Sequence, residues 1–404
     1  MAQASGTSPA VQEAGGGKGK LMFATMSGLG LQSMSTMLLS YVLTTMIAEF
    51  GLSSAAGGFI STVTNIGMLV GGIIFGTLAD RYGRVKIFAI TVAIFSVATG
   101  LTALSTNIAL VYVFRFLVGV GGGGEYGAIM SMIADAYTKK ERGRMNSYVT
   151  VSGQVGSIVA AIAAALIVPV FGWRGLFVFG ALPVLLAIWA HFSLGESATW
   201  KSATEHSASK PGIRDLFVEG RASTTIRLII MAIAQVAGYF GLMNWLPSIL
   251  QSSLGLSVSG SSIWMIATIV GMSLGMIVFG QIMDRIDAKV AYGVFLVASA
   301  VAVFLYSFAG SAPAMLVGGA IVGFFCNGMN AGYGAIVGNL YPVEIRATAN
   351  NIIFNIGRAV GGFSSVAIGF FLDNFSLTIA MLFLSVMYMI SLACVLSLKP
   401  HAQE

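Results

Sequence analysis

Three ionisable residues, Arg115, Glu125 and Arg358, interrupt long apolar stretches of this sequence. A charge in hydrocarbon is costly, so such a residue faces water, pairs with another group or, if it is a carboxyl group, holds a proton. Glu125 is therefore a candidate for carrying a proton. Arg115 lies about 15 Å away along the same helix and would act on Glu125 through water or another helix. The alternative is that Glu125 is a structural carboxylate with a permanent partner.

Arg358 indicates a different chemistry, because a guanidinium keeps its charge and offers a planar fork of donors that matches a carboxylate. It shares one helical face with Asn351, Asn355, Gly362 and Ser365, and a polar stripe on an apolar helix must face a cavity. We predict that Arg358 binds an organic anion; a permanent internal ion pair is the alternative.

Uncharged residues could line the same cavity, although ordinary hydrogen bonding between helices is an equal alternative for each of them. These candidates are Gln32, Gln154, Tyr126, Gln235, Tyr239, Asn330, Tyr333 and Asn355.

The composition shows which elements must position these groups. Of the 404 residues, 56% are hydrophobic and only 9% are charged, whereas a soluble domain is about a quarter charged. The mean hydropathy of +0.88 reflects apolar runs that match the thickness of a bilayer. The sequence has no metal-ligand spacing, no histidine beside a nucleophile and no phosphate-binding loop. We therefore expect neither an enzyme nor a bound metal or cofactor.

Twelve apolar runs of about 20 residues predict an all-α membrane protein with twelve transmembrane helices. The runs lie near residues 21–48, 54–78, 87–104, 108–133, 145–171, 175–194, 228–250, 259–283, 290–308, 313–340, 348–371 and 376–396. We expect one six-helix bundle at 21–194, a cytoplasmic linker at 195–227, a second bundle at 228–398, and cytoplasmic tails at 1–20 and 399–404.

The distribution of basic residues supports this count. Of the 21 Lys and Arg residues, all except Arg115, Arg174 and Arg358 fall in the tails or in loops after even-numbered helices. Lys and Arg gather on the cytoplasmic side, so both termini should be cytoplasmic. The net charge of +6 then follows from membrane topology and gives no reason to expect a nucleic-acid partner.

Two internal echoes, about two hundred residues apart, indicate that the halves are related. The segment from Asp80 to Arg84 is echoed by Asp284-Arg285, and Tyr126-Gly127-Ala128-Ile129 is echoed by Tyr333-Gly334-Ala335-Ile336. Asp80 could accept hydrogen bonds from a helix N-terminus of the opposite half and so close the cytoplasmic side. Simple anchoring by the positive-inside rule is the alternative. The predicted cytoplasmic gate comprises Asp80, Arg81, Gly83, Arg84, Asp135, Asp284, Arg285, Glu344 and Arg346.

The segment Gly76-Thr77-Leu78-Ala79-Asp80-Arg81-Tyr82-Gly83-Arg84 resembles the G-x-L-A-D-R-x-G-R signature of the major facilitator superfamily. The R-x-x-x-G pattern at Arg115 and the run Gly123-Gly124-Glu125-Tyr126-Gly127 resemble the metabolite:proton symporters, in particular the sialic-acid and monocarboxylate branch. The resemblance covers nearly the whole chain. It implies two pseudo-symmetric six-helix bundles that alternate access to a central site.

From these observations we expect a proton-coupled symporter that takes up a small organic anion such as a monocarboxylate, sialic acid or an aromatic acid. It would work as a monomer in the bacterial inner membrane, among lipids, driven by the proton gradient. The alternatives are a drug or metabolite efflux antiporter, a carrier of a neutral solute such as a sugar, and a transporter-like sensor. Efflux relatives usually carry a G-x-x-x-G-P pattern in helix 5, and the segment from Ser152 to Ser157 has no proline.

Overall fold

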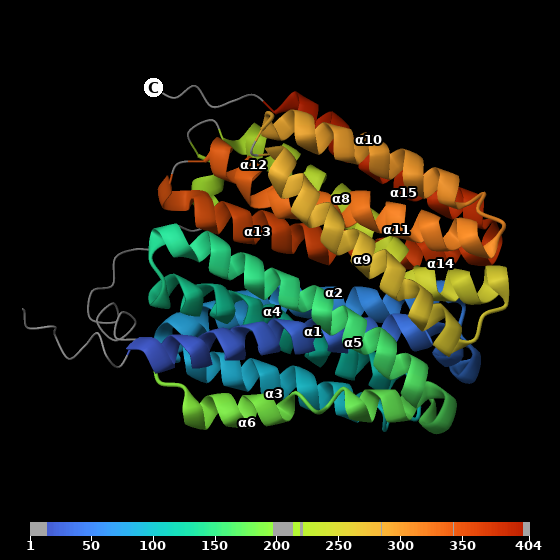
Figure 1. Cartoon of the computed structure of the whole chain (residues 1–404), viewed down its shortest axis with the longest axis horizontal. Coiled ribbons are helices and arrows are strands. Elements are labelled where there is room, and N and C mark those ends of the chain that lie inside the picture. Colours follow the sequence, from blue (N-terminus) through green and yellow to red (C-terminus); the bar gives the residue numbers. More distant parts are fainter. Residues whose placement is uncertain (1–13, 197–212, 219–220, 284, 342, 399–404) are drawn as a thin grey trace, which may run out of the picture.

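The computed structural model describes residues 14–196, 213–218, 221–283, 285–341 and 343–398, which form helices and no strands. Two helical bundles lie one above the other (Figure 1). The first half contains α1 (Ala14–Phe50), α2 (Ser54–Tyr82), α3 (Arg84–Thr102), α4 (Ile108–Ala136), α5 (Lys139–Phe179) and α6 (Val184–Ser193). The second half contains α8 (Ala222–Leu254), α9 (Val258–Met283), α10 (Ala288–Tyr306), α11 (Ala312–Gly328), α12 (Tyr333–Leu340), α13 (Val343–Gly361), α14 (Ser364–Asn374) and α15 (Leu377–Ser397). The short 3₁₀ helices η2 (Ile213–Leu216) and η3 (Met329–Gly332) complete the described elements.

Both ends of the described chain lie at the same end of the molecule, at the left in Figure 1. We call this the terminal end and the opposite end the distal end. Successive passes alternate in direction between the two ends, and some passes consist of two helices. Two helices begin earlier than the apolar runs that predicted them. α1 starts at Ala14 and not at Leu21, and α8 starts at Ala222 and not at Leu228.

Ten helical segments of the described chain are long and apolar enough to cross a membrane. One of them, Met145–Ser193, contains two passes, because Gly172 adopts φ 63° and ψ −172° and interrupts α5 between its longer first part and its last turns, which continue toward α6. A left-handed φ is cheap only for glycine. Together with the shorter apolar helix Ala312–Gly328, these segments make up the twelve predicted passes, and the predicted interruption between Phe171 and Gly175 is confirmed.

Two of the predicted passes each consist of two helices, a division that the sequence did not predict. The run at 313–340 is divided by the 3₁₀ helix η3, and the run at 348–371 is divided between Gly361 and Ser364. Around η3, Asn327 and Asn330 bond with each other, and Asn330 also bonds to α8. Glycine and asparagine both weaken a helix interior, and the amide bonds stabilise the break.

Close helix contacts in each half depend on glycine. On α2, Gly67 and Gly71 lie against carbonyl oxygens of α4, and Gly119 and Gly123 of α4 lie against carbonyl oxygens of α2. A Cβ atom at any of these four positions would be closer to the oxygen than van der Waals contact allows. In the second half, Gly271 and Gly275 of α9 pack in the same way on α11. Such close contacts between small residues are typical of packed membrane helices.

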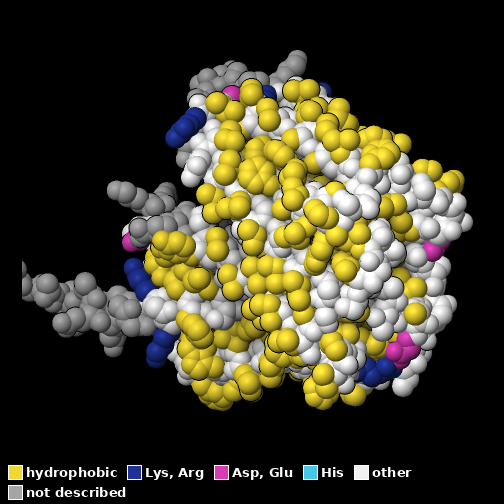
Figure 2. Space-filling model, turned by 45° about the vertical axis from the view of Figure 1, so that its right-hand side comes forward, with side chains coloured by type: hydrophobic (Ala, Val, Ile, Leu, Met, Phe, Trp, Pro, Cys, Tyr) yellow, Lys and Arg dark blue, Asp and Glu magenta, His cyan; other side chains and the backbone are white. Residues whose placement is uncertain are grey.

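The surface agrees with a lipid environment. In Figure 2 the Lys, Arg, Asp and Glu side chains of the visible face lie toward its edges, and hydrophobic and uncharged groups cover the area between. Many large apolar side chains of the described chain are exposed, for example Leu166, Val170 and Phe192. Such an apolar band is what a bilayer-spanning protein presents to acyl chains.

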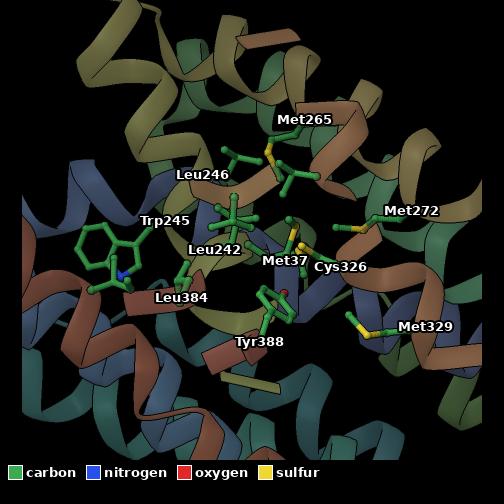
Figure 3. Packing of buried hydrophobic residues seen from close by; sticks show 14 of the residues in the cluster. Met37, Leu242, Trp245, Leu246, Met265, Met272, Cys326, Met329, Leu384 and Tyr388 are labelled. Carbon is green, nitrogen blue, oxygen red and sulfur yellow. The ribbon is translucent and has the colours of Figure 1, made fainter. Parts of the chain in front are cut away.

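The buried hydrophobic cluster reaches across both halves. Met37 of α1 belongs to the same cluster as Leu242 of α8, Met265 of α9, Cys326 of α11 and Tyr388 of α15, and Figure 3 shows these residues around one region. Several members of the cluster are methionines, whose flexible side chains adapt to shifting neighbours.

Candidate functional site

Arg358 lies where the two halves meet. It projects from α13, and its guanidinium donates to the sulfur of Met68 on α2, in the other half. The guanidinium also lies 5.8 Å from the ring centre of Phe354 and interacts electrostatically with Tyr126 of α4 and Tyr239 of α8. Within the described ranges no carboxylate forms an ion pair with Arg358. The N–H groups of the Arg358 guanidinium can therefore bind an acceptor from outside the described residues.

Asn355 lies on the same face of α13, as predicted. Its amide is next to Gly72 of α2, so Asn355 and Arg358 both face the first half. The two residues are three positions apart, which places them on adjacent turns of one helix face. Tyr126, with 37% of its surface exposed, contributes a hydroxyl from the opposite side.

Glu125 is adjacent to Tyr126 in sequence but lies in a different environment. It is fully buried, and its carboxyl group is beside Gly28 of α1 and the ring of Phe88 of α3. Neither oxygen has a hydrogen-bond partner among the described residues. Glu125 therefore does not face the central contact where Arg358 lies but is enclosed within the first half. Of the three predicted options, water, a partner or a held proton, the enclosed position without a described partner fits the held proton.

Arg115 is also fully buried. One of its terminal nitrogens donates to the carbonyl of Ser35 over 3.3 Å, and its guanidinium lies 4.4 Å from the ring centre of Phe177. Its Nε and second terminal nitrogen find no partner in the described part of the chain. The two ionisable groups of α4 do not bond to each other directly, as their separation predicted.

The remaining predicted cavity residues fall into two groups. Gln32 of α1 donates to Thr36 over 3.2 Å, and Gln154 is half-buried on α5. In the second half, Gln235 of α8 accepts from Tyr292 and donates to Asn330 over 2.7 Å. Asn330 in turn donates to Asn327 over 2.7 Å. The structure thus joins Gln235 and Asn330 in one amide network at the helix break.

Tyr333 adjoins this network. Its hydroxyl is buried without a partner among the described residues, and its ring lies 5.5 Å from that of Phe354, which also contacts Arg358. Tyr333 therefore extends the polar network of the second half toward the arginine site.

A small cavity lies between the halves on the distal side of this region. Its polar lining comprises Thr36, Ser61, Thr64, Asn65 and Asn244, and its volume is about 10 Å³. That volume is about the space that one water needs. In this conformation the cavity is too small for an organic solute.

The predicted gate is described in part. Arg84 forms an ion pair with Asp135 of α4 and donates to the carbonyl of Ser131 over 3.0 Å. Gly83 joins α2 to α3 with φ 110°, a value that favours glycine. Arg81 and Arg285 are exposed. The side chains of Asp80, Glu344 and Arg346, and the whole of Asp284, lie outside the described residues, so their roles remain predictions.

Sequence reasoning missed Glu196, which follows α6. Its carboxylate accepts hydrogen bonds from the backbone N–H groups of Arg84, Val85 and Lys86 at 2.9, 3.2 and 2.9 Å. It therefore caps the N-terminus of α3, a favourable place for negative charge. An acidic residue directly after an apolar run was the available signal. Asp373, at the end of α14, was also missed; it accepts hydrogen bonds from α2.

Comparisons with known proteins agree with this architecture. A family model described as Major Facilitator Superfamily matches residues 25–289 and 228–404. A metabolite transport protein of Haemophilus influenzae is 35% identical over 390 residues, covering 95% of this chain and 96% of that protein. The cis,cis-muconate transport protein of Acinetobacter baylyi is 30% identical, with 88% of this chain and 87% of that protein covered.

A sialic acid transporter of Escherichia coli is 27% identical, and the match covers 88% of this chain and 87% of that protein. Among solved structures, a D-xylose-proton symporter superposes with a TM-score of 0.81 at 17% identity, covering 96% of this chain and 99% of that chain. The helical fold, the apolar helices and these matches all lead to the same assignment. The chain belongs to the Major Facilitator Superfamily and is an integral membrane transporter, not an enzyme.

Proposed function

We propose that this protein takes up a small organic anion together with a proton. The observation that carries the proposal is the placement of Arg358 between the halves, with no carboxylate partner among the described residues. A guanidinium that is partly removed from water and has no counter-ion is costly. A substrate carboxylate that arrives between the halves would supply that counter-ion and accept a bidentate pair of hydrogen bonds.

The groups around Arg358 favour an anion that has a flat or unsaturated body. Tyr126, Tyr239 and Phe354 surround the guanidinium, and aromatic rings pack well against planar solutes. Relatives of this chain are described as transporters of cis,cis-muconate, niacin and sialic acid, and niacin and muconate combine a carboxylate with a planar skeleton. We therefore place a planar monocarboxylate or dicarboxylate first among the candidate substrates.

Glu125 is the proposed proton site. A buried carboxyl group without hydrogen-bond partners is stable only when neutral, and its enclosure in the first half fits a group that holds a proton in this conformation. Release requires water to reach Glu125 in another conformation. Arg115, ten residues away on α4, would favour the ionised form at that stage through water. The proton gradient then supplies the driving force, and no cofactor is required.

In the proposed cycle the two halves rock about the Arg358 region, and the charged loops at the terminal end close and open one side. Residues 21–194 and 228–398 would act as the two moving bundles, joined by the linker at 195–227. We place the protein in the bacterial inner membrane as a monomer with both termini in the cytoplasm, in agreement with the distribution of Lys and Arg.

A neutral solute such as a sugar is the second candidate, and one observation favours it. The amide network of Gln235 and Asn330 offers both donors and acceptors, which is what hydroxyl groups require. The two candidates differ in their need for Arg358. A carrier of a neutral solute should tolerate the loss of the guanidinium, and an anion carrier should not.

The test is uptake into proteoliposomes under an imposed proton gradient, with radiolabelled cis,cis-muconate, nicotinate, benzoate and sialic acid, and with xylose as the neutral probe. We expect at least one carboxylate to accumulate, and its uptake to collapse when the gradient is dissipated by a protonophore. Arg227→Lys is a suitable control, since Arg227 donates to the carbonyl of Ser397 at the terminal end, away from the site. Accumulation of xylose without any carboxylate would overturn the anion proposal.

A further inference from the structure

At the distal end, the N-terminus of α2 is capped by a residue of the other half. The backbone N–H groups of Ser54 and Ala55 donate to the two carboxylate oxygens of Asp373, each over 3.1 Å. The next N–H group, that of Ala56, donates to Ser53 over 3.2 Å. A helix N-terminus attracts negative charge and leaves its first N–H groups without helical partners. Asp373 therefore satisfies two N–H groups that the first half itself leaves free.

The backbone contact beside Asp373 is unusually close. Gly58 of α2 lies against the carbonyl of Ser365, and Gly369 of α14 lies against the carbonyl of Ser54. A Cβ atom at either glycine would overlap the opposite backbone. Thr62 adds a hydrogen bond of 2.9 Å to the carbonyl of Gly362. α2 and α14 are therefore in direct contact at the distal end.

Further bonds between the halves lie nearby. Thr44 bonds with Ser248 over 2.7 Å, and Ser40 bonds with Asn244 over 3.4 Å. These bonds are between neutral groups, whereas the Asp373 bonds place a charged acceptor on a helix N-terminus. Charge-assisted bonds of this kind are about twice as strong as neutral ones.

We propose that Asp373 is a distal latch, a residue that holds the two halves together at the distal end and must release α2 whenever the central site opens to that side. Opening separates α2 from α14, so it breaks both carboxylate bonds at once. The strength of this cap therefore sets the fraction of molecules that are closed at the distal end. The sequence predicts that Asp80, at the opposite end of α2, closes the terminal side in the same way. The α2 helix would then be latched at one end in each state.

The experiment measures the distance between the halves in purified protein, so it depends neither on the substrate nor on the orientation in the membrane. Spin labels on Thr106→Cys and Ser311→Cys, which lie in distal loops of different halves and are exposed, report this distance by double electron–electron resonance. Cys326 and Cys394 are the two native thiols and are replaced by serine in every variant. The test variant is Asp373→Ala. The matched control is Ser53→Ala, which weakens the cap on the same helix terminus without involving the other half.

We expect Asp373→Ala to raise the ratio of distal-open to distal-closed molecules about tenfold, as the loss of a strong helix cap predicts. Asp373→Asn keeps an acceptor but loses the charge, and should give an intermediate shift. Ser53→Ala should leave the distance distribution unchanged.

Two results would overturn the proposal: an unchanged distribution in Asp373→Ala, or an equal shift in Ser53→Ala, which would point to fraying of α2 alone. If Asp373→Ala does not yield folded protein, Asp373→Asn decides by the same criterion.

Discussion

Glu125 and Arg358 are both ionisable groups inside the membrane, but they occupy different kinds of place. Glu125 is enclosed within one half, beside Gly28 and Phe88, whereas Arg358 lies between the halves and touches Met68 of the other bundle. A group enclosed in one half can change its charge with little change in the contact between halves. A group between the halves cannot bind a ligand without affecting how they fit together. Under the proposed function, the proton and the anion are handled by separate parts of the protein, and α4, which carries both Glu125 and Tyr126, connects them.

Removal of the Arg358 guanidinium should have the largest effect. Arg358→Ala leaves the site without its cation and should weaken binding of a carboxylate substrate by about 100-fold, as expected for a lost charged hydrogen-bonding partner. Arg358→Lys keeps the charge but not the fork, so it should recover only part of the loss. Isothermal titration in detergent measures both affinities. Wild-type affinity in either variant would exclude Arg358 as the anion anchor.

Glu125→Gln should have the second-largest effect, because it should separate substrate binding from proton-driven accumulation. The amide mimics the protonated carboxyl group, so substrate binding and substrate-for-substrate exchange should survive, with a change below about fivefold. Accumulation driven by a proton gradient should disappear, since the proton can no longer be released. Substrate affinity of the native protein should also weaken as the pH rises, and that of Glu125→Gln should not. A variant that still concentrates substrate in proteoliposomes would show that the proton travels elsewhere.

The sequence predicted the depth of Glu125 but not the direction of its side chain. Successive residues on a helix point about 100° apart, and the four residues before Glu125 are all glycines. All four are buried, so no apolar or polar stripe shows which face of α4 is internal. Arg358 was easier to orient, because Asn355 lies on the same face of a helix that has larger and more varied side chains.

The apolar passes could be predicted because they depend on local composition, and the structure confirms them. The cap formed by Glu196 on α3 could not, since the two segments are more than a hundred residues apart in the chain. The Asp373 contact with α2 was missed for the same reason. Long-range caps require that the relative position of the helices be known first.

Gly28→Ala should give a smaller effect on the proton site without touching the carboxyl group. A methyl group at this position would overlap Glu125 and the Phe88 ring, so the carboxyl group must shift. Overpacking of this kind costs about 1–3 kcal/mol, and we expect a lower melting temperature and gradient-driven uptake reduced about tenfold. Gly127→Ala is the control, since Gly127 lies on the same helix as Glu125 and has open space around it. Equal losses in both variants would mean that α4 is merely intolerant of alanine.

The smallest effect is expected from the tyrosine that follows Glu125. Tyr126 interacts electrostatically with Arg358 and is partly exposed, so Tyr126→Phe removes one hydroxyl from the anion site and keeps the ring. The loss of one hydrogen bond should weaken substrate binding by about threefold and leave the accumulation ratio at saturating substrate unchanged. Tyr148→Phe, which alters an exposed tyrosine on α5, should change neither quantity. The two neighbours on α4 would then have opposite phenotypes, with coupling lost at Glu125 and affinity reduced at Tyr126. If Tyr126→Phe instead abolished gradient-driven accumulation while binding stayed normal, the proton would pass through the anion site, and the division between the two regions would be wrong.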